Sequence, residues 1–103
     1  MEALLARGQD NFLIRFGLGG EYVRRKDYEK AVPHLRAAVA FDPRHAASWK
    51  LLGTALAALD RVAEAEAAYE EGIRVAEADG HIQAAREMTV FLKRLRKAHP
   101  GSI

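Results

Sequence analysis

The sequence contains no cysteine, which excludes disulfide bonds, thiol nucleophiles and thiolate metal ligands. No apolar run comes near the roughly 20 residues that a membrane-spanning helix needs. Residues 1–7 show no basic region followed by a long apolar stretch, so no signal peptide is expected. Alternating runs of Val, Ile and Thr are also missing, which disfavours strands. These absences predict a cytoplasmic, helical protein.

The charge of the chain is close to balanced, and this limits the partners that it suggests. The 16 Lys and Arg residues against 14 Asp and Glu residues give a formal net charge of +2. Such a charge is too small to indicate a nucleic-acid-binding protein on its own. With 103 residues, half of them hydrophobic, the chain is expected to fold as one domain around a small core.

Helix-forming residues dominate the composition, and the helix breakers fall at useful places. Ala, Leu, Glu and Arg are among the strongest helix formers. Pro43 ends one helical pattern because proline lacks an amide donor and disfavours helix in the residue before it. Asp60-Arg61 and Asp79-Gly80 separate later patterns. The breaks predict a short helical turn and then five helices, at about 2–8, 10–25, 28–41, 46–59, 62–78 and 80–98.

A shift of 34 residues superimposes the chain on itself. The matched pairs are Leu18 with Leu52, Gly19 with Gly53, Ala31 with Ala65, Leu35 with Tyr69, Ala38 with Gly72 and Val39 with Ile73. All six pairs are matched in size, and all are in phase with two helix pairs. Small residues are needed where two helices cross closely, so Gly19 and Gly53 are expected to meet Ala31 and Ala65. A repeated pair of antiparallel helices is predicted.

These positions resemble the tetratricopeptide repeat (TPR), a 34-residue helix–turn–helix unit with preferred residues at fixed positions. The second unit carries the resemblance at Trp49, Leu52, Gly53, Ala65, Tyr69 and Gly72. The first unit carries it at Leu18, Gly19, Tyr22, Ala31, Leu35, Ala38 and Pro43. Arg15, Leu56 and Glu77 depart from the family, which prefers Trp, Tyr and Pro there. The resemblance implies an all-α fold of antiparallel helix–turn–helix pairs, stacked as a short right-handed α-solenoid.

The register divides the single domain into segments. We expect an N-terminal cap at 1–11, a first repeat at 12–45, a second repeat at 46–79, a C-terminal capping helix at 80–98 and a tail at 99–103. Met1, Leu4 and Leu5 match Leu35, Ala38 and Val39, so the first residues resemble the remnant of a preceding second helix. Terminal repeats of this kind serve as caps.

The last helix is predicted to have two different faces. Its packing face should cover the second repeat with Ile82, Ala85, Met88, Thr89, Leu92 and Leu95. Its polar face should point outward with Gln83, Arg86, Glu87, Lys93, Arg94 and Lys97. The basic run 93–97 suggests a nucleic-acid or anionic-lipid patch, or a charged cap beside the acidic residues Glu64, Glu66, Glu70 and Glu71. The cap is favoured, because no aromatic residues alternate with the cations.

No constellation for catalysis or metal binding stands out. The four histidines have no partner at metal-binding spacing, and Ser48, Ser102, Thr54 and Thr89 have no evident base. The segment Gly17-Leu18-Gly19-Gly20 follows no strand and no Lys-Ser/Thr comes after it, so it is not expected to bind phosphate. A non-catalytic protein without cofactor or metal is predicted.

The resemblance places ligand-facing residues on the first helix of each unit, which lines the concave side of the stack. The expected partner-binding groove consists of Leu13, Phe16, Gly20, Val23, Arg24, Ala47, Lys50, Leu51, Thr54, His81, Ala84 and Met88. This lining is mainly apolar, although some of these residues could belong to the core instead. The family's clamp for chaperone carboxylates is disfavoured, because its Lys/Asn/Asn/Lys/Arg set is replaced by Phe16, Gly20, Leu51, His81 and Ala85.

An apolar groove favours one kind of partner. The leading hypothesis is a protein–protein interaction module that binds an apolar peptide or an amphipathic helix. One alternative is homo-oligomerisation through the same groove, because two repeats are fewer than such arrays usually need. Another is a small chaperone of the kind that serves secretion systems. A nucleic-acid role through the basic C-terminal helix ranks last.

Overall fold

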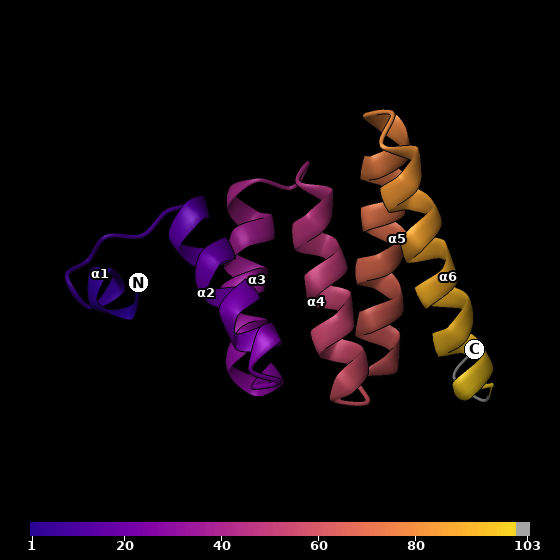
Figure 1. The fold of residues 1–103 in the computed structure, drawn as a ribbon, viewed down its shortest axis with the longest axis horizontal. Coiled ribbons are helices and arrows are strands. Elements are labelled where there is room, and N and C mark those ends of the chain that lie inside the picture. Colours follow the sequence, from indigo (N-terminus) through magenta and orange to yellow (C-terminus); the bar gives the residue numbers. More distant parts are fainter. Residues whose placement is uncertain (101–103) are drawn as a thin grey trace.

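The computed structural model describes residues 1–100, and within that range the secondary structure is entirely α-helical. The six helices are α1 (Glu2–Ala6), α2 (Phe12–Arg24), α3 (Tyr28–Phe41), α4 (Ala46–Ala58), α5 (Val62–Ala78) and α6 (Ile82–Ala98). From α2 onward each helix contacts the next, and they succeed one another along the longest dimension of the molecule (Figure 1). The expected all-α fold of stacked antiparallel pairs is confirmed, with α1 as the short helix before them.

The turn inside each pair is built in the same way. At the end of α2, the amide of Lys26 donates to the carbonyl of Val23 at 2.9 Å and that of Asp27 to Tyr22 at 2.8 Å. One repeat later, the amide of Asp60 donates to the carbonyl of Ala57 at 3.0 Å and that of Arg61 to Leu56 at 2.9 Å. This double hydrogen bond is the Schellman motif, which requires a left-handed residue after the helix. Lys26 and Asp60 take that conformation, with φ of 61° and 59°.

The core is organised around glycines that face large side chains. A Cβ atom on Gly19 would lie 2.4 Å from Leu35, and one on Gly53 would lie 2.7 Å from the ring of Tyr69. The close approach at these glycines is therefore made by Leu35 and Tyr69, whereas the sequence predicted contact with Ala31 and Ala65. Those alanines are fully buried in the core. The glycine removes the side chain that the large neighbour would otherwise meet.

Helix α6 packs on the second repeat through Ala85, Met88, Leu92 and Leu95, as the sequence predicted. Ile82 was expected on the same face, but its side chain is 61% exposed. The prediction for Ile82 is wrong. Each residue turns the helix by about 100°, so the three residues from Ile82 to Ala85 turn it by about 300°. Ile82 therefore lies roughly 60° around the helix axis from Ala85, beyond the edge of the buried face.

The N-terminal helix α1 docks lightly on α2. None of its residues is buried, but the thioether of Met1 covers Gly17. The hydroxyl of Tyr22 donates a hydrogen bond to the carboxylate of Glu2. Helix α1 therefore covers part of the outer surface of α2. Of the tail expected at 99–103, residues 101–103 lie outside the described residues.

Candidate functional site: the concave face

The first helices of the pairs form the inner, concave side of the stack. Helix α2 contacts α4, and α4 contacts α6. Between α3 and α5, in contrast, no pair of Cα atoms lies within 8 Å, and the long side chains of Arg36 and Glu64 span the distance. Helices that approach one another on one side and separate on the other produce a curved stack. The surface of α2, α4 and α6 is therefore the candidate site, and we call it the concave face.

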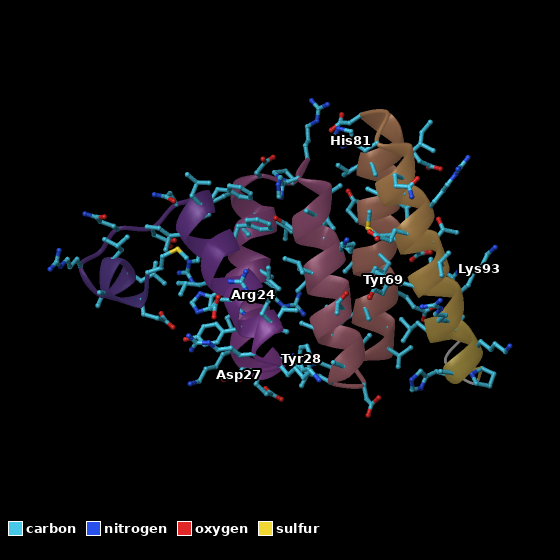
Figure 2. The ribbon with its side chains drawn as sticks, viewed as in Figure 1. Arg24, Asp27, Tyr28, Tyr69, His81 and Lys93 are labelled. Atoms are coloured by element: carbon cyan, nitrogen blue, oxygen red, sulfur yellow. The ribbon has the colours of Figure 1, made fainter. Side chains whose placement is uncertain are left out.

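The expected groove residues differ widely in exposure. Leu13 is 73% exposed, and Arg24, Ala47 and His81 are also exposed. Seven of the expected residues are half-buried: Phe16, Gly20, Val23, Lys50, Leu51, Thr54 and Ala84. Figure 2 places Arg24 in the N-terminal part of the stack and His81 in its C-terminal part. The predicted residues thus span the stack from α2 to the start of α6.

Met88 corrects the prediction, because its side chain is 0% exposed. It fills the space over Gly72, where an added Cβ would lie 2.5 Å from the sulfur atom. A long, flexible thioether suits such an irregular gap. Met88 is a core residue between α5 and α6 and cannot contact a partner on the concave face.

Aromatic rings cluster where α2 and α4 begin. Phe12 and Phe16 stack with their ring centroids 5.6 Å apart. The ring of His45 meets Phe12 edge-on at 4.9 Å and Phe16 at 4.8 Å. Asn11 fixes the start of α2 by accepting a hydrogen bond from the amide of Ile14 at 3.0 Å. Part of the surface of Phe16 is thus covered by its own chain, through partners that the repeat register did not reveal.

The middle of the concave face holds an ion pair between two first helices. The ammonium of Lys50 in α4 lies 2.6 Å from the carboxylate of Glu87 in α6. On α2, a Cβ added to Gly20 would lie 3.9 Å from Leu51, an ordinary contact distance, so there is room for a methyl group at Gly20. The sequence predicted Lys50 on this face, but it placed Glu87 on the outer face of α6. The pairing was missed because it joins residues 37 positions apart.

A pocket of about 330 Å³ opens between α4, α5 and α6. It is lined by Thr54, Ala57, Tyr69, Phe91, Arg94 and Leu95. The hydroxyl of Thr54 donates to the carbonyl of Lys50 at 2.9 Å. Since Thr54 has a single hydroxyl proton, Tyr69 is the donor in the 3.1 Å contact between their hydroxyl groups. Burial raises the pKa of Tyr69, so its hydroxyl stays protonated. The polar atoms are satisfied, which leaves an apolar pocket with Arg94 beside it.

Titratable side chains also gather around His34, outside the concave face. Its Nδ1 lies 3.1 Å from the guanidinium of Arg15, and its Nε2 lies 3.7 Å from the carboxylate of Glu2. The ring stacks on Tyr22 at 5.6 Å. Burial lowers the pKa of His34, and the Glu2 carboxylate opposes that shift. These contacts join α1, α2 and α3 around a largely buried ring, so the cluster holds α1 against the first helix pair.

Two other features are absent from residues 1–100, a metal site and a membrane-spanning helix. No group of three or more His, Asp or Glu side chains there is arranged to hold a metal ion. None of the helices in this part of the chain has the length and apolar character required to cross a bilayer.

The helix pairs, their repeated turns and the concave face together define a helical-repeat protein. The family model described as Tetratricopeptide repeat matches residues 1–43 and 16–81, and the chain belongs to this family. It is 47% identical over 98 residues to the TPR repeat-containing protein PA0015 of Pseudomonas aeruginosa, a match covering 95% of this chain and 93% of the relative. It also resembles the solution structure of protein BPP2914 from Bordetella parapertussis, with a TM-score of 0.80 and 43% identity, over 94% of this chain and 84% of that one. Tetratricopeptide repeats generally mediate interactions between proteins.

Proposed function

We propose that this chain is a non-catalytic interaction module that binds an apolar peptide or an amphipathic helix of a partner protein on its concave face. The observation that carries the proposal is the apolar pocket between α4, α5 and α6. Leu13, at the start of α2, adds a second apolar side chain that is 73% exposed. Exposed apolar surface on a small protein is typical of interaction sites. The partner's apolar side chains would enter the pocket and contact Leu51 beside Gly20.

The concave face also offers polar contacts that would orient a bound segment. Arg24 and Lys50 are each paired with a glutamate of their own chain, Glu21 and Glu87. The exposed His81 stands at the start of α6. In such a site, the apolar contacts supply most of the affinity and the polar groups set the direction of the bound chain.

Peptide selection followed by variant binding tests this proposal. Random peptides displayed on phage are selected on the full chain, and the tightest one is made synthetically and titrated by calorimetry. Leu13→Glu and Ala47→Glu place a charge on exposed positions of the concave face without disturbing the core. Ala63→Glu is the matched control on the exposed surface of α5. We expect roughly tenfold weaker binding for the first two variants and unchanged binding for the control.

Two results would overturn the assignment of the concave face. One is equal affinity of the selected peptide for all three variants. The other is a set of amide shift changes that is confined to α3 and α5.

Self-association through the same face is the second candidate function. It is favoured by the large exposure of Leu13 and by the small number of repeats, since arrays of this type usually need three or more. Sedimentation velocity at increasing concentration decides between the two. Dimerisation that Leu13→Glu abolishes would support self-association, and a monomer at the highest concentration would eliminate it.

A further inference from the structure

The outer side of α6 carries a strip of residues that face away from the concave face. Ile82, Arg86, Val90, Lys93 and Lys97 follow one another at spacings of three or four, so they share one side of the helix. We call this set the outer strip. All five residues are exposed, and Ile82 and Val90 are 61% and 44% exposed. Two apolar side chains and three cations therefore share a helix surface that residues 1–100 leave uncovered.

The three cations of the outer strip have no carboxylate partner within residues 1–100. The neighbouring Arg96 binds Glu66 at 2.8 Å and Glu70 at 3.1 Å, both in α5. The expected attraction between the basic run and the acidic helix is thus confirmed, but Arg96 alone satisfies it. Glu87, the acidic residue of α6, is bound to Lys50. The outer strip consequently presents positive charge that no ion pair within residues 1–100 neutralises.

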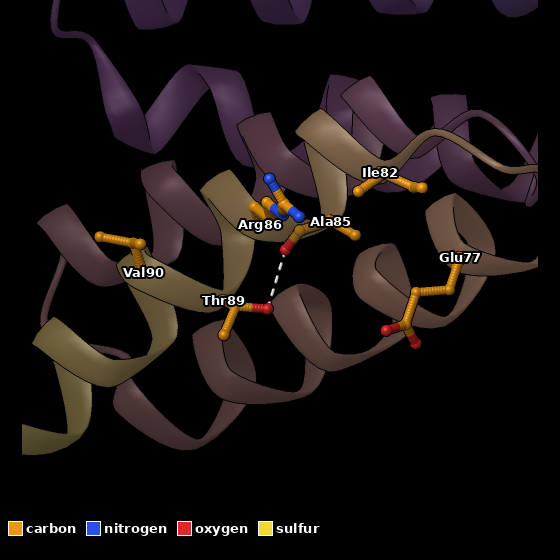
Figure 3. A pocket seen from close by; sticks show the side chains of 6 residues that line it. All are labelled: Glu77, Ile82, Ala85, Arg86, Thr89 and Val90. Carbon is orange, nitrogen blue, oxygen red and sulfur yellow. Dashed lines mark hydrogen bonds between the residues drawn. The ribbon is translucent and has the colours of Figure 1, made fainter.

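A pocket lies directly beside the outer strip. It has a volume of about 450 Å³ and is lined by Glu77, Ile82, Ala85, Arg86, Thr89 and Val90. Figure 3 shows Ile82 and Val90 toward its two ends, with Ala85 and Thr89 between them. The hydroxyl of Thr89 is already used, because it donates to the carbonyl of Ala85 at 2.8 Å. The pocket therefore has room for an apolar side chain that approaches α6 from outside.

The repeat itself shows what covers this side of a first helix. One repeat earlier, the position of Val90 is held by Leu56, which is buried under α5, and two repeats earlier by Tyr22, which stacks on His34 of α3. In both pairs a second helix lies over the position. Within the described residues, α6 has no such helix. An added helix would therefore occupy the place that α3 and α5 hold on α2 and α4.

We propose that the outer strip of α6 binds one acidic amphipathic helix of a partner protein, which completes a third helix pair. The charge of the strip selects the partner: its uncompensated cations require acidic side chains, and Ile82, Val90 and the pocket require an apolar edge. The chain already contains one example, since α5 is an acidic second helix whose Glu66 and Glu70 bind a cation of α6. This site is independent of the concave face.

A nucleic acid fits the same surface less well. The outer strip contains no aromatic side chain on which a base could stack. Ile82 and Val90 would remain exposed beneath a phosphate backbone, whereas a partner helix would cover them.

Binding of designed helical peptides tests the proposal on the full chain. The probe is a side-chain-stapled helix of Leu, Ala and Glu, with leucines at spacings of three and four along one edge. Its two controls are the same peptide with Lys in place of Glu, and a scrambled acidic peptide without the leucine edge. Amide shift mapping should place the acidic helix on Arg86, Val90 and Lys93, and its affinity should fall as salt increases.

Variants then assign the site to the outer strip. Val90→Asp and Lys93→Glu should each weaken the acidic helix roughly tenfold, whereas the charge-matched control Arg7→Glu, on the opposite end of the stack, should leave its affinity unchanged. Circular dichroism of each variant verifies that the fold is intact.

The proposal is overturned if the acidic helix does not bind, if the scrambled or lysine peptide binds equally well, or if the shifts fall on α2 and α4. Tighter binding of a short DNA duplex than of the acidic helix would assign the surface to nucleic acid instead.

Discussion

Replacement of Gly53 by alanine tests the packing of the helix pairs directly. The added methyl group would lie 2.7 Å from Cδ1 and from Cε1 of Tyr69, and 3.0 Å from Cζ. Tyr69 cannot easily move aside, because its side chain is 4% exposed, its ring is rigid and its hydroxyl is bonded to Thr54. The two helices must therefore separate, or the ring must leave its position.

The magnitude follows from two opposing effects. Alanine is a better helix former than glycine by about 0.8–1 kcal/mol. Overpacking of a core costs about 1–3 kcal/mol, and a rigid buried ring favours the upper part of that range. The free energy of unfolding should consequently fall by about 1–2 kcal/mol. For a domain of this size each kcal/mol corresponds to about 4–8 °C in the melting temperature.

Gly20→Ala is the matched control, because it makes the same change in the same kind of helix. There the new methyl group would meet only Leu51, at the ordinary contact distance of 3.9 Å. Gly20→Ala should therefore raise the unfolding free energy by about 0.5–1 kcal/mol. Urea unfolding followed by circular dichroism measures both variants. If Gly53→Ala were as stable as Gly20→Ala, the account of the helix crossing would be refuted.

Three further predictions concern buried side chains. Met88→Ala should lower the unfolding free energy by about 2–5 kcal/mol in urea unfolding, because it leaves a cavity over Gly72. A loss of stability well below this range would mean that Met88 is not a core residue. Tyr69→Phe should cost about 0.5–1.5 kcal/mol in the same assay through loss of the hydrogen bond to Thr54, and Tyr69→Phe in a Thr54→Val background should cost less. Burial lowers the pKa of His34 below its ordinary 6.5. At acidic pH the folded chain therefore binds fewer protons than the unfolded chain, and the free energy of unfolding should decline as the pH falls through 6.5 and below. His34→Gln should reduce this decline, as measured by thermal melts at a series of pH values. A melting temperature that depends on pH in the same way in His34→Gln and the parent protein would contradict this prediction.

The sequence predicted the helices and their pairing well because local signals mark both. Pro43, Gly80 and the turns around Lys26 and Asp60 interrupt the helical patterns, and the observed helix ends fall within about two residues of most expected ends. The 34-residue register also located Gly19 and Gly53. Spacing alone did not reveal that Leu35 and Tyr69, rather than alanines, approach these glycines most closely, since that depends on the rotation of each helix about its axis.

The concave face was less predictable for the same reason. The register assigned Met88 to a first helix, but it could not tell whether that side chain faces a partner or the gap over Gly72. It placed Glu87 among outward cations, whereas the carboxylate reaches Lys50 across the stack. Both outcomes depend on how α6 is seated on α4 and α5, which contacts between distant residues determine.

Amide shift mapping with the selected peptide tests the central claim, which is that the concave face binds a partner. The isotope-labelled full chain is titrated with the tightest displayed peptide. The account predicts shift changes along α2, α4 and α6, centred on Leu13, Ala47 and Thr54. Changes confined to the outward surfaces of α3 and α5 would contradict it.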